Sequence, residues 1–201
     1  MQLDNSTFEL KRALRRRALT WVPDPVVMET HGGYGRLYSA CYRAVPVGVV
    51  FEMDEKKATA LAKQRPTWAV YQGDCVKALA EGAGSFLTVN VLDLDPYGEP
   101  WPALDAFLIS ERPRAETLVI VVNDGLRQKI QMGGAWQVES LGEAVQQFGA
   151  DLFDVYLSVC RWLVEQKAAM TGYAVGRFVG YYCGRQGHMN HYAALLSKAG
   201  P

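Results

Sequence analysis

The chain has 201 residues, of which 49% are hydrophobic, so it can fill one core but has no room for a second full domain. We therefore expect a single α/β domain over residues 1–201. The 21 Lys and Arg residues balance 21 Asp and Glu residues, which excludes a strong overall positive field that would recruit a polyanion. The 4 Cys residues lie far apart without metal-ligand spacing, which argues against a zinc or iron–sulfur site.

The N-terminal segment predicts a basic helix. Apolar residues of segment 8–21 lie mostly at helical spacing, and polar residues at positions 5–7 precede them as candidate caps. We expect this helix, within residues 1–22, to pack on the domain. Its basic residues suit either contact with phosphates or an ordinary solvated face; they are Lys11, Arg12, Arg15, Arg16 and Arg17.

Apolar runs alternate with helical patterns through the rest of the chain, which is typical of a parallel sheet with connecting helices. Strands are predicted at residues 26–30, 47–51, 68–71, 86–94 and 116–123, and helices at residues 36–43, 55–63, 76–81 and 101–110. Residues 124–140 predict a partly helical excursion, and residues 141–170 one long or broken helix. The last two strand-like segments, 173–182 and 191–197, predict an antiparallel hairpin.

A glycine-rich turn, Gly32-Gly33-Tyr34-Gly35, follows the first predicted strand and precedes a helix. This order brings backbone N–H groups and a helix N-terminus against a ligand. Its glycines would let the chain pass close under a nucleoside with an amino-acid tail. A dinucleotide-binding fingerprint would need a further glycine where Tyr38 stands, so a nicotinamide-dependent oxidoreductase is the weaker interpretation.

Acidic residues follow the second and third predicted strands. An acid about 20 residues beyond the glycine turn is where α/β nucleoside binders hold the ribose hydroxyls, and Glu52 is our choice, with Asp54 as the alternative. Either acid could instead cap the following helix. Asp74 could accept a hydrogen bond from an adenine amino group, cap its own helix, or do both.

The fourth predicted strand ends in Asp95-Pro96-Tyr97-Gly98. Asp95 offers an acceptor carboxylate, Pro96 a carbonyl oxygen without an amide hydrogen, and Tyr97 a flat ring. Together they suit a planar ring whose exocyclic amine bonds to the Asp95 carboxylate and the Pro96 carbonyl while the ring stacks on Tyr97. The nitrogen lone pair would then face a methyl donor. The same residues are turn formers, so a plain turn is the alternative.

In combination, these features resemble the class I S-adenosylmethionine-dependent methyltransferases over residues 26–197. The resemblance implies a three-layer Rossmann-like fold, with a mostly parallel seven-stranded sheet and a C-terminal antiparallel hairpin. It also implies S-adenosyl-L-methionine as the cofactor and no metal. The positions that it implies for cofactor binding are Glu29, Gly33, Gly35, Glu52 and Asp74.

The segment Asp93-Leu94-Asp95-Pro96-Tyr97-Gly98 is most similar to the Asp-Leu-Asp-Pro-Phe-Gly signature of tRNA guanine-N2 dimethyltransferases. That similarity implies Asp95, Pro96 and Tyr97 as the catalytic residues. DNA adenine-N6 enzymes carry Asp-Pro-Pro-Tyr, whose second proline is missing here. The tRNA enzymes have a separate C-terminal domain and the DNA enzymes a target-recognition domain. Here the basic terminal segments or a protein partner would hold the substrate, unless the substrate is small.

We therefore expect an N-methyltransferase that acts on a nucleobase amine in nucleic acid, with RNA favoured over DNA and guanine N2 of tRNA as the first candidate. The alternatives are a DNA adenine-N6 enzyme, a small-molecule N-methyltransferase and a non-catalytic S-adenosylmethionine-binding subunit. The sequence has neither an apolar signal core nor a run of about 18 apolar residues, so we expect a cytoplasmic protein without a membrane span.

Overall fold

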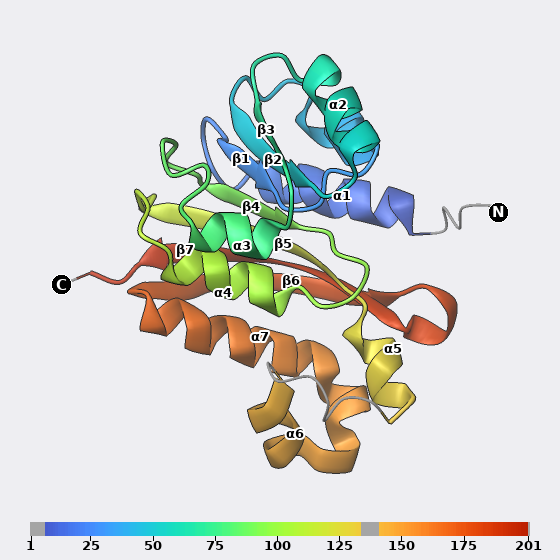
Figure 1. The fold of residues 1–201 in the computed structure, drawn as a ribbon. Helices are drawn as coiled ribbons and strands as arrows, with labels where there is room; N and C mark the ends of the chain where they lie inside the picture. The colour runs from blue at the N-terminus through green and yellow to red at the C-terminus, as the bar shows by residue number, and fades with distance from the viewer. Residues whose placement is uncertain (1–6, 134–140, 201) are drawn as a thin grey trace.

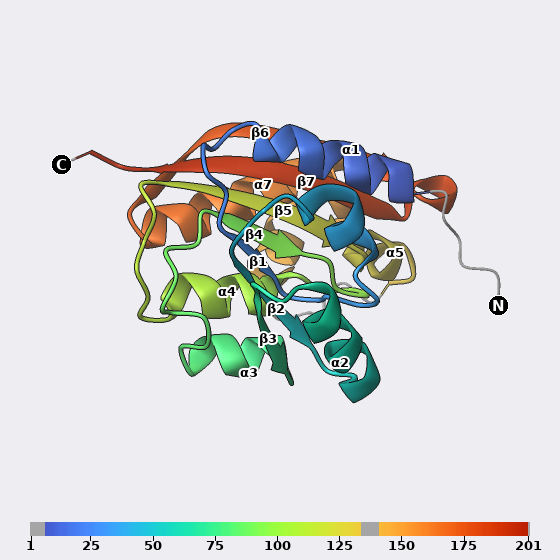
Figure 2. The same cartoon turned by 90° about the horizontal axis from the view of Figure 1, so that it is seen from above.

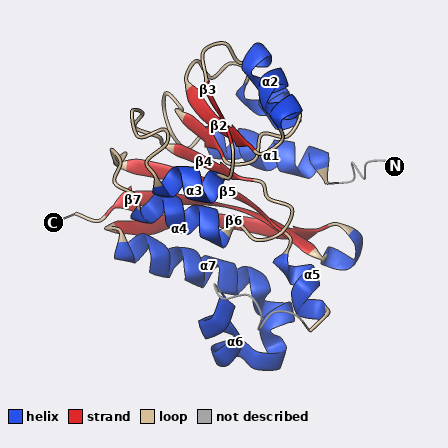
Figure 3. Ribbon diagram, viewed as in Figure 1, coloured by secondary structure: helices blue, strands red, loops and turns tan. Residues whose placement is uncertain are grey.

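The structure, a computed structural model, describes residues 7–133 and 141–200. These residues form one seven-stranded sheet with helices on both faces (Figures 1 and 3). In chain order the strands are β1 (Val27–Glu29), β2 (Gly48–Glu52), β3 (Ala69–Gln72), β4 (Val91–Leu94), β5 (Thr117–Asp124), β6 (Tyr173–Cys183) and β7 (Met189–Lys198).

The helices alternate with these strands as far as β5 and then cluster before β6. The α-helices are α1 (Phe8–Leu19), α2 (Glu55–Gln64), α3 (Cys75–Ala80), α4 (Trp101–Ile109), α5 (Leu126–Gln131), α6 (Gly142–Phe148) and α7 (Leu152–Met170). The shorter helical segments are the π-helix η1 (Tyr38–Tyr42) and the 3-10 turns η4 (Gly149–Asp151) and η5 (Arg185–Gly187). None of the helices in the described ranges is both long and apolar enough to cross a lipid bilayer.

The strand order is β3-β2-β1-β4-β5-β7-β6. Pairing is parallel from β3 through β5, whereas β7 pairs antiparallel with both β5 and β6. The mostly parallel seven-stranded sheet and its C-terminal hairpin are therefore confirmed. Because β1, β2, β3 and β4 are adjacent and parallel, the segments that follow them meet along one edge of the sheet.

Helices cover the sheet in two layers, as the view from above shows (Figure 2). The helices α1, η1 and α2 contribute to one apolar core, in which the largest buried side chains include Tyr42, Leu61 and Trp68. The helices α3, α4 and α7 contribute to the core on the opposite face, around Trp101, Phe107 and Tyr156. The predicted three-layer architecture is confirmed.

The fourth strand is shorter than its apolar run predicts, because only Val91–Leu94 of residues 86–94 is strand. Residues 82–87 instead form tight turns, in which the Ser85 N–H donates to the Gly82 carbonyl and the Leu87 N–H to the Gly84 carbonyl. Both glycines have positive φ, which favours such turns. These turns occupy the residues that the apolar pattern assigns to the start of the strand.

Other differences lie at element ends and breaks. The first helix ends at Leu19, and the segment predicted as a helix over residues 36–43 is mainly the π-helix η1. The long helical region breaks at Gly149, whose φ of +51° ends α6 before α7 begins. The candidate cap residues at positions 5 and 6, and residues 134–140 of the predicted excursion, lie outside the described residues.

Candidate functional site

The glycine turn and the acid at the tip of β2 contact each other directly. The Gly33 N–H donates to Glu52 Oε2 at 2.7 Å, and the Asp54 N–H donates to Glu52 Oε1 at 3.0 Å. Gly33 and Gly35 have φ of +54° and +74°, a conformation that glycine adopts without strain. Nothing lies within 4 Å of a Cβ built at Gly33, so the backbone there is open to a ligand. A carboxylate and a bare turn thus face the same space.

Glu52 and Asp54, the two candidates for the ribose ligand, have different surroundings. Asp54 is the N-cap of α2, where its carboxylate accepts the Lys57 N–H at 3.0 Å. This bond to the backbone lowers the pKa of Asp54. Glu52 caps no helix and is directed at the glycine turn. Asp54 therefore has a structural role that Glu52 does not have.

Asp74 occupies the corresponding place after β3. Its carboxylate caps α3 by accepting the N–H groups of Val76 at 2.8 Å and Lys77 at 3.2 Å. The adjacent Gly73 N–H donates to the Glu52 carbonyl at 3.0 Å, so the ends of β2 and β3 are joined. The capping role predicted for Asp74 is present, and its contact with adenine stays a prediction.

Glu29 lies deeper than the other candidate residues. It ends β1 with 3% of its surface exposed, and its carboxylate pairs with the buried guanidinium of Arg65. Burial raises the pKa of Glu29, and Arg65 only partly offsets this effect. Arg65 also lies over the rings of Tyr38 and Trp68, at 4.2 and 5.0 Å from their centroids. The cofactor-binding role of Glu29 stays a prediction; here its carboxylate contacts Arg65.

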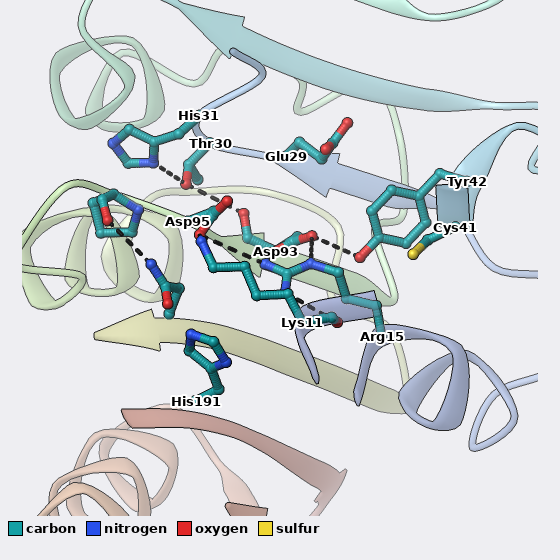
Figure 4. A network of polar contacts seen from close by, with 12 residues as sticks. Lys11, Arg15, Glu29, Thr30, His31, Cys41, Tyr42, Asp93, Asp95 and His191 are labelled. Atoms are coloured by element: carbon teal, nitrogen blue, oxygen red, sulfur yellow. Dashed lines mark hydrogen bonds and ion pairs between the residues drawn. The ribbon is translucent and has the colours of Figure 1, made fainter. Parts of the chain in front are cut away.

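A buried ion pair underlies the end of β4 (Figure 4). Arg15 of α1 donates to both oxygens of Asp93, from Nε at 2.7 Å and from a terminal nitrogen at 2.6 Å. The Tyr42 hydroxyl donates to the same carboxylate at 2.6 Å. Arg15 is 0% and Asp93 1% exposed, so α1 is joined to the central strand through the interior. Arg15 therefore belongs to neither of the two faces suggested for the N-terminal basic residues.

Asp95 is held by Lys11, which lies one turn before Arg15 on the same helix. Lys11 Nζ donates to Asp95 Oδ1 at 2.7 Å, and a terminal nitrogen of Arg15 lies 4.0 Å from the same oxygen. Burial acts to raise the pKa of Asp95, but Arg15 and Lys11 outweigh it, so this pKa lies below its usual range. Asp95 is therefore ionised at neutral pH and has Oδ2 left to accept a further hydrogen bond.

Pro96 and Tyr97 differ sharply in exposure. Pro96 is buried, and its carbonyl accepts a long hydrogen bond of 3.5 Å from Asn123 Nδ2. Tyr97 is fully exposed, so its ring is open to stacking. The Gly98 carbonyl accepts the Gly125 N–H at 3.0 Å, which joins the loop after β4 to the end of β5. The structure brings Asp95, Pro96 and Tyr97 to one edge, and their catalytic roles stay predictions.

His31 stands at this edge, although the sequence reasoning gave it no role. Its Nδ1 lies 2.7 Å from the Thr30 hydroxyl, which itself donates to the Asp93 carbonyl at 3.2 Å. On the other side of the ring, Nε2 lies 3.8 Å from Cys75 Sγ. Burial lowers the pKa of His31, so the ring is neutral at pH 7. Its place directly after a strand and before the glycine turn was the available sequence signal.

His191, on β7, is the other histidine drawn in Figure 4. It is fully buried, with Nδ1 at 3.2 Å from the Tyr181 hydroxyl and Nε2 at 3.3 Å from Cys183 Sγ. Burial, followed by Lys11 and Arg15, lowers its pKa to about 3. It is a neutral packing residue. Across residues 7–133 and 141–200, no three His, Cys, Asp or Glu side chains are grouped so that they could hold a metal ion.

Comparison with known proteins gives matches in structure alone. No model of a known protein family matches the sequence, and no curated protein matches it. Trm1 from Pyrococcus horikoshii, solved with S-adenosyl-L-methionine, aligns with a TM-score of 0.68 and 11% identity over 98% of this chain and 56% of Trm1. TYW2 from M. jannaschii, solved with AdoMet, aligns with a TM-score of 0.61 and 12% identity over 99% of this chain and 78% of TYW2.

A third match has a different kind of ligand. The plantazolicin methyltransferase BamL, solved with a triazolic desmethylPZN analog and SAH, aligns with a TM-score of 0.57 and 8% identity over 96% of this chain and 85% of BamL. The chain thus spans little more than half the length of Trm1 but most of BamL. The fold of this protein is the Rossmann-like fold of these methyltransferases.

The buried pair between α1 and β4 generates a stability prediction. Asp93→Ala leaves Arg15 charged and buried without its partner, so we expect the free energy of unfolding to fall by about 3–5 kcal/mol. Urea denaturation at pH 7 measures this loss. The matched control is Arg17→Ala, an exposed position on the same helix, which should change stability by less than about 0.5 kcal/mol. A loss below about 1 kcal/mol for Asp93→Ala would contradict the anchoring role.

The end of β5 generates a pH prediction. Asp124 is fully buried and accepts hydrogen bonds from the Leu126 N–H at 2.8 Å and the Tyr156 hydroxyl at 2.9 Å. Burial nonetheless raises its pKa to about 7 from an ordinary value of 3.8. The folded protein therefore binds this proton more tightly than the unfolded chain, and stability is lost as the pH rises from about 4 through 7.

Asp124→Asn removes this titration. We expect the variant to gain stability relative to the wild type between pH 5 and pH 8, by up to about 3 kcal/mol at 1.36 kcal/mol per pKa unit. Denaturant titrations of both proteins at pH 5 and pH 8 measure the difference in their free energies of unfolding. The titration of the buried Glu29 contributes equally to both proteins, so it cancels in this difference. The same difference at both pH values would show that Asp124 does not titrate in this range.

Proposed function

We propose that this protein is an S-adenosylmethionine-dependent methyltransferase that acts on the exocyclic amine of a nucleobase in RNA, with guanine N2 of tRNA as the first candidate. The observation that carries the proposal is the meeting of two features at one sheet edge. The glycine turn after β1 faces the Glu52 carboxylate at 2.7 Å, and the segment after β4, the strand that pairs with β1, presents an ionised Asp95 beside a fully exposed Tyr97. The shared fold supports the same conclusion.

The residues at the ends of β1 and β2 fit a nucleoside with a charged tail. Glu52 is an acceptor whose backbone donors, Gly33 and Asp54, are peptide N–H groups, and ribose hydroxyls can replace or join these donors. Gly33 leaves space for a close approach. Asp74 is exposed after β3, at the same edge of the sheet, where its carboxylate would accept a hydrogen bond from the adenine amino group. S-adenosylmethionine would supply a methyl group activated by its sulfonium leaving group.

The residues after β4 would position the acceptor. Asp95 accepts a hydrogen bond from the exocyclic amine through Oδ2, while Lys11 keeps Oδ1. The carboxylate also stabilises the positive charge that develops on nitrogen as the N–C bond forms. Tyr97 stacks on the base, which must leave any helix to reach this edge. One proton is then lost from the methylated nitrogen, and Asp95 or solvent receives it.

The direct test is transfer of labelled methyl from S-adenosylmethionine to pooled tRNA and to genomic DNA in parallel, followed by digestion to nucleosides. We expect label in methylated guanosine of the tRNA sample. Label in DNA adenine instead would contradict the RNA assignment. No label in either, with tight cofactor binding, would contradict the nucleic-acid substrate and favour a small molecule or a non-catalytic binding subunit.

Asp95→Ala separates chemistry from cofactor binding. Because Asp95 holds the acceptor rather than the cofactor, we expect kcat to fall at least about 100-fold, as is typical when an oriented catalytic group is lost. The dissociation constant for S-adenosylmethionine should stay within about threefold, measured by calorimetric titration. Weakened cofactor binding with an unchanged kcat would rule out the role proposed for Asp95.

Glu52→Ala should show the reverse pattern. Loss of charge-assisted hydrogen bonds to the ribose hydroxyls should weaken cofactor binding by about 10-fold to 100-fold. The matched control is Asp54→Ala, which removes the cap of α2 and should lower stability but leave the cofactor affinity nearly unchanged. If Asp54→Ala weakened binding and Glu52→Ala did not, the ribose ligand would be Asp54.

A further inference from the structure

A groove of about 660 Å³ opens between the start of α1, the glycine turn and η1. Phe8 lines it from α1, Tyr34 from the turn, and Arg36 and Arg43 from the segment that contains η1. The volume lies within the range of small-molecule and cofactor sites and is large enough for about one nucleotide. None of the residues named so far as catalytic lines this groove.

The groove has a positive lining. Arg36 and Arg43 are exposed, and no acidic side chain is among the described residues that line it. Arg16, also exposed, borders it and donates from two guanidinium nitrogens to the Ala40 carbonyl, at 3.0 and 3.3 Å. The nearest acid on α1, Glu9, pairs with Arg12. Although the chain has no net charge, the described residues that line this groove include two arginines and no acid, and Arg16 borders it.

Aromatic rings accompany these cations. Tyr34 is 70% exposed, and the Lys57 ammonium lies 5.3 Å from its ring centroid. The Arg36 guanidinium lies over the Phe8 ring at 4.6 Å. Guanidinium groups that can bind phosphates next to an exposed ring that can stack on a base are the recurring composition of single-strand nucleic-acid sites.

The groove adjoins both halves of the candidate site. Phe8 and Lys11 are three residues apart on α1, so their side chains are neighbours on one helix face, and Lys11 contacts Asp95. On the other side, Tyr34 directly follows Gly33, whose N–H donates to Glu52. A nucleic-acid strand that places one base at Asp95 therefore needs only to cross the first turn of α1 to reach the groove.

We propose that this groove binds the backbone phosphates and one unpaired base of an RNA strand, at the nucleotide next to the target. The inference rests on the proposed function for its choice of RNA. Arg36 and Arg43 bind the phosphates, and Tyr34 stacks on the base. Sequence-specific RNA recognition mostly uses single-stranded loops with bases stacked on aromatic side chains, and a recessed site of one nucleotide fits a loop better than a duplex.

The test measures binding without requiring methyl transfer. A fluorescein-labelled single-stranded RNA of 12 nucleotides is titrated with the full chain, and anisotropy is followed between 50 and 200 mM salt. For the double variant R36Q/R43Q we expect an affinity at least about tenfold lower. We also expect the slope of log affinity against log salt to fall by about 1.4, from two phosphate contacts at about 0.7 each on a single strand.

Two further variants keep the result interpretable. Arg161→Gln on α7, an exposed arginine on the opposite face of the sheet, is the matched control and should bind RNA as the wild type does. Tyr34→Leu should lower the affinity at least about fivefold with an unchanged salt slope, because it removes stacking but no charge. Melting temperatures within a few degrees of the wild type establish that each variant is folded.

Wild-type affinity and salt slope in R36Q/R43Q would overturn the proposal, as would equal losses in R161Q. Binding of single-stranded DNA at least as tight as RNA would overturn the choice of RNA. If the protein methylated RNA but the groove variants bound RNA as the wild type does, the groove proposal would be rejected and the proposed methyltransferase activity would stand. If the groove variants lost RNA binding but the wild type transferred no methyl group, the proposed activity would be rejected and the groove proposal would stand.

Discussion

The ion pair between Arg15 and Asp93 is the interaction on which the candidate site depends. It joins the N-terminal helix to the central strand β4 with both partners buried, and Tyr42 adds a third group from η1. Burying two charges is costly unless their hydrogen bonds are satisfied, and both carboxylate oxygens are bonded here. Because α1 is fixed in this way, Lys11 is held beside Asp95 and Phe8 beside the glycine turn.

The helix α1 makes two ion pairs that differ in exposure, Arg15 with Asp93 and Lys11 with Asp95. The Arg15 side chain is 0% exposed, whereas the Lys11 side chain is 17% exposed and that of Asp95 19%. The inner pair therefore serves the fold, and the outer pair lies where a substrate can reach it. Cations also keep Asp95 ionised, whereas burial raises the pKa values of Glu29 and Asp124 near the ends of β1 and β5. Neighbouring strand ends thus present carboxyl groups of different basicity.

The order of elements and the residues at strand ends were predictable because parallel strands bring their carboxyl ends to one edge. That rule alone brings Glu52, Asp74 and Asp95 to the same edge. The partners of these acids were not predictable, because helical spacing shows that Arg15 and Lys11 lie one turn apart but not which strand they contact. The buried charge of Asp93, two residues before Asp95 in an apolar strand, was the only signal that a cation must reach it.

The length of β4 was also not predictable from the sequence pattern. Hydrophobicity alone predicts a strand over residues 86–94, but only Val91–Leu94 forms β4, because the chain before it turns around Gly82 and Gly84. Likewise the place of His31 depends on Thr30, whose hydroxyl contacts both the ring and the backbone of β4. Backbone turns decide the first feature and a contact between strands the second, and a linear hydrophobic pattern contains neither.

The most direct test of the account is a crystal structure of the protein with S-adenosylhomocysteine. We predict the ribose hydroxyls on the Glu52 carboxylate, the amino-acid tail across Gly33 and Gly35, and the sulfur directed toward Asp95. Ligand bound elsewhere, or Glu52 still bonded to Gly33 with no ligand at saturating concentration, would contradict the assignment of this sheet edge as the cofactor site.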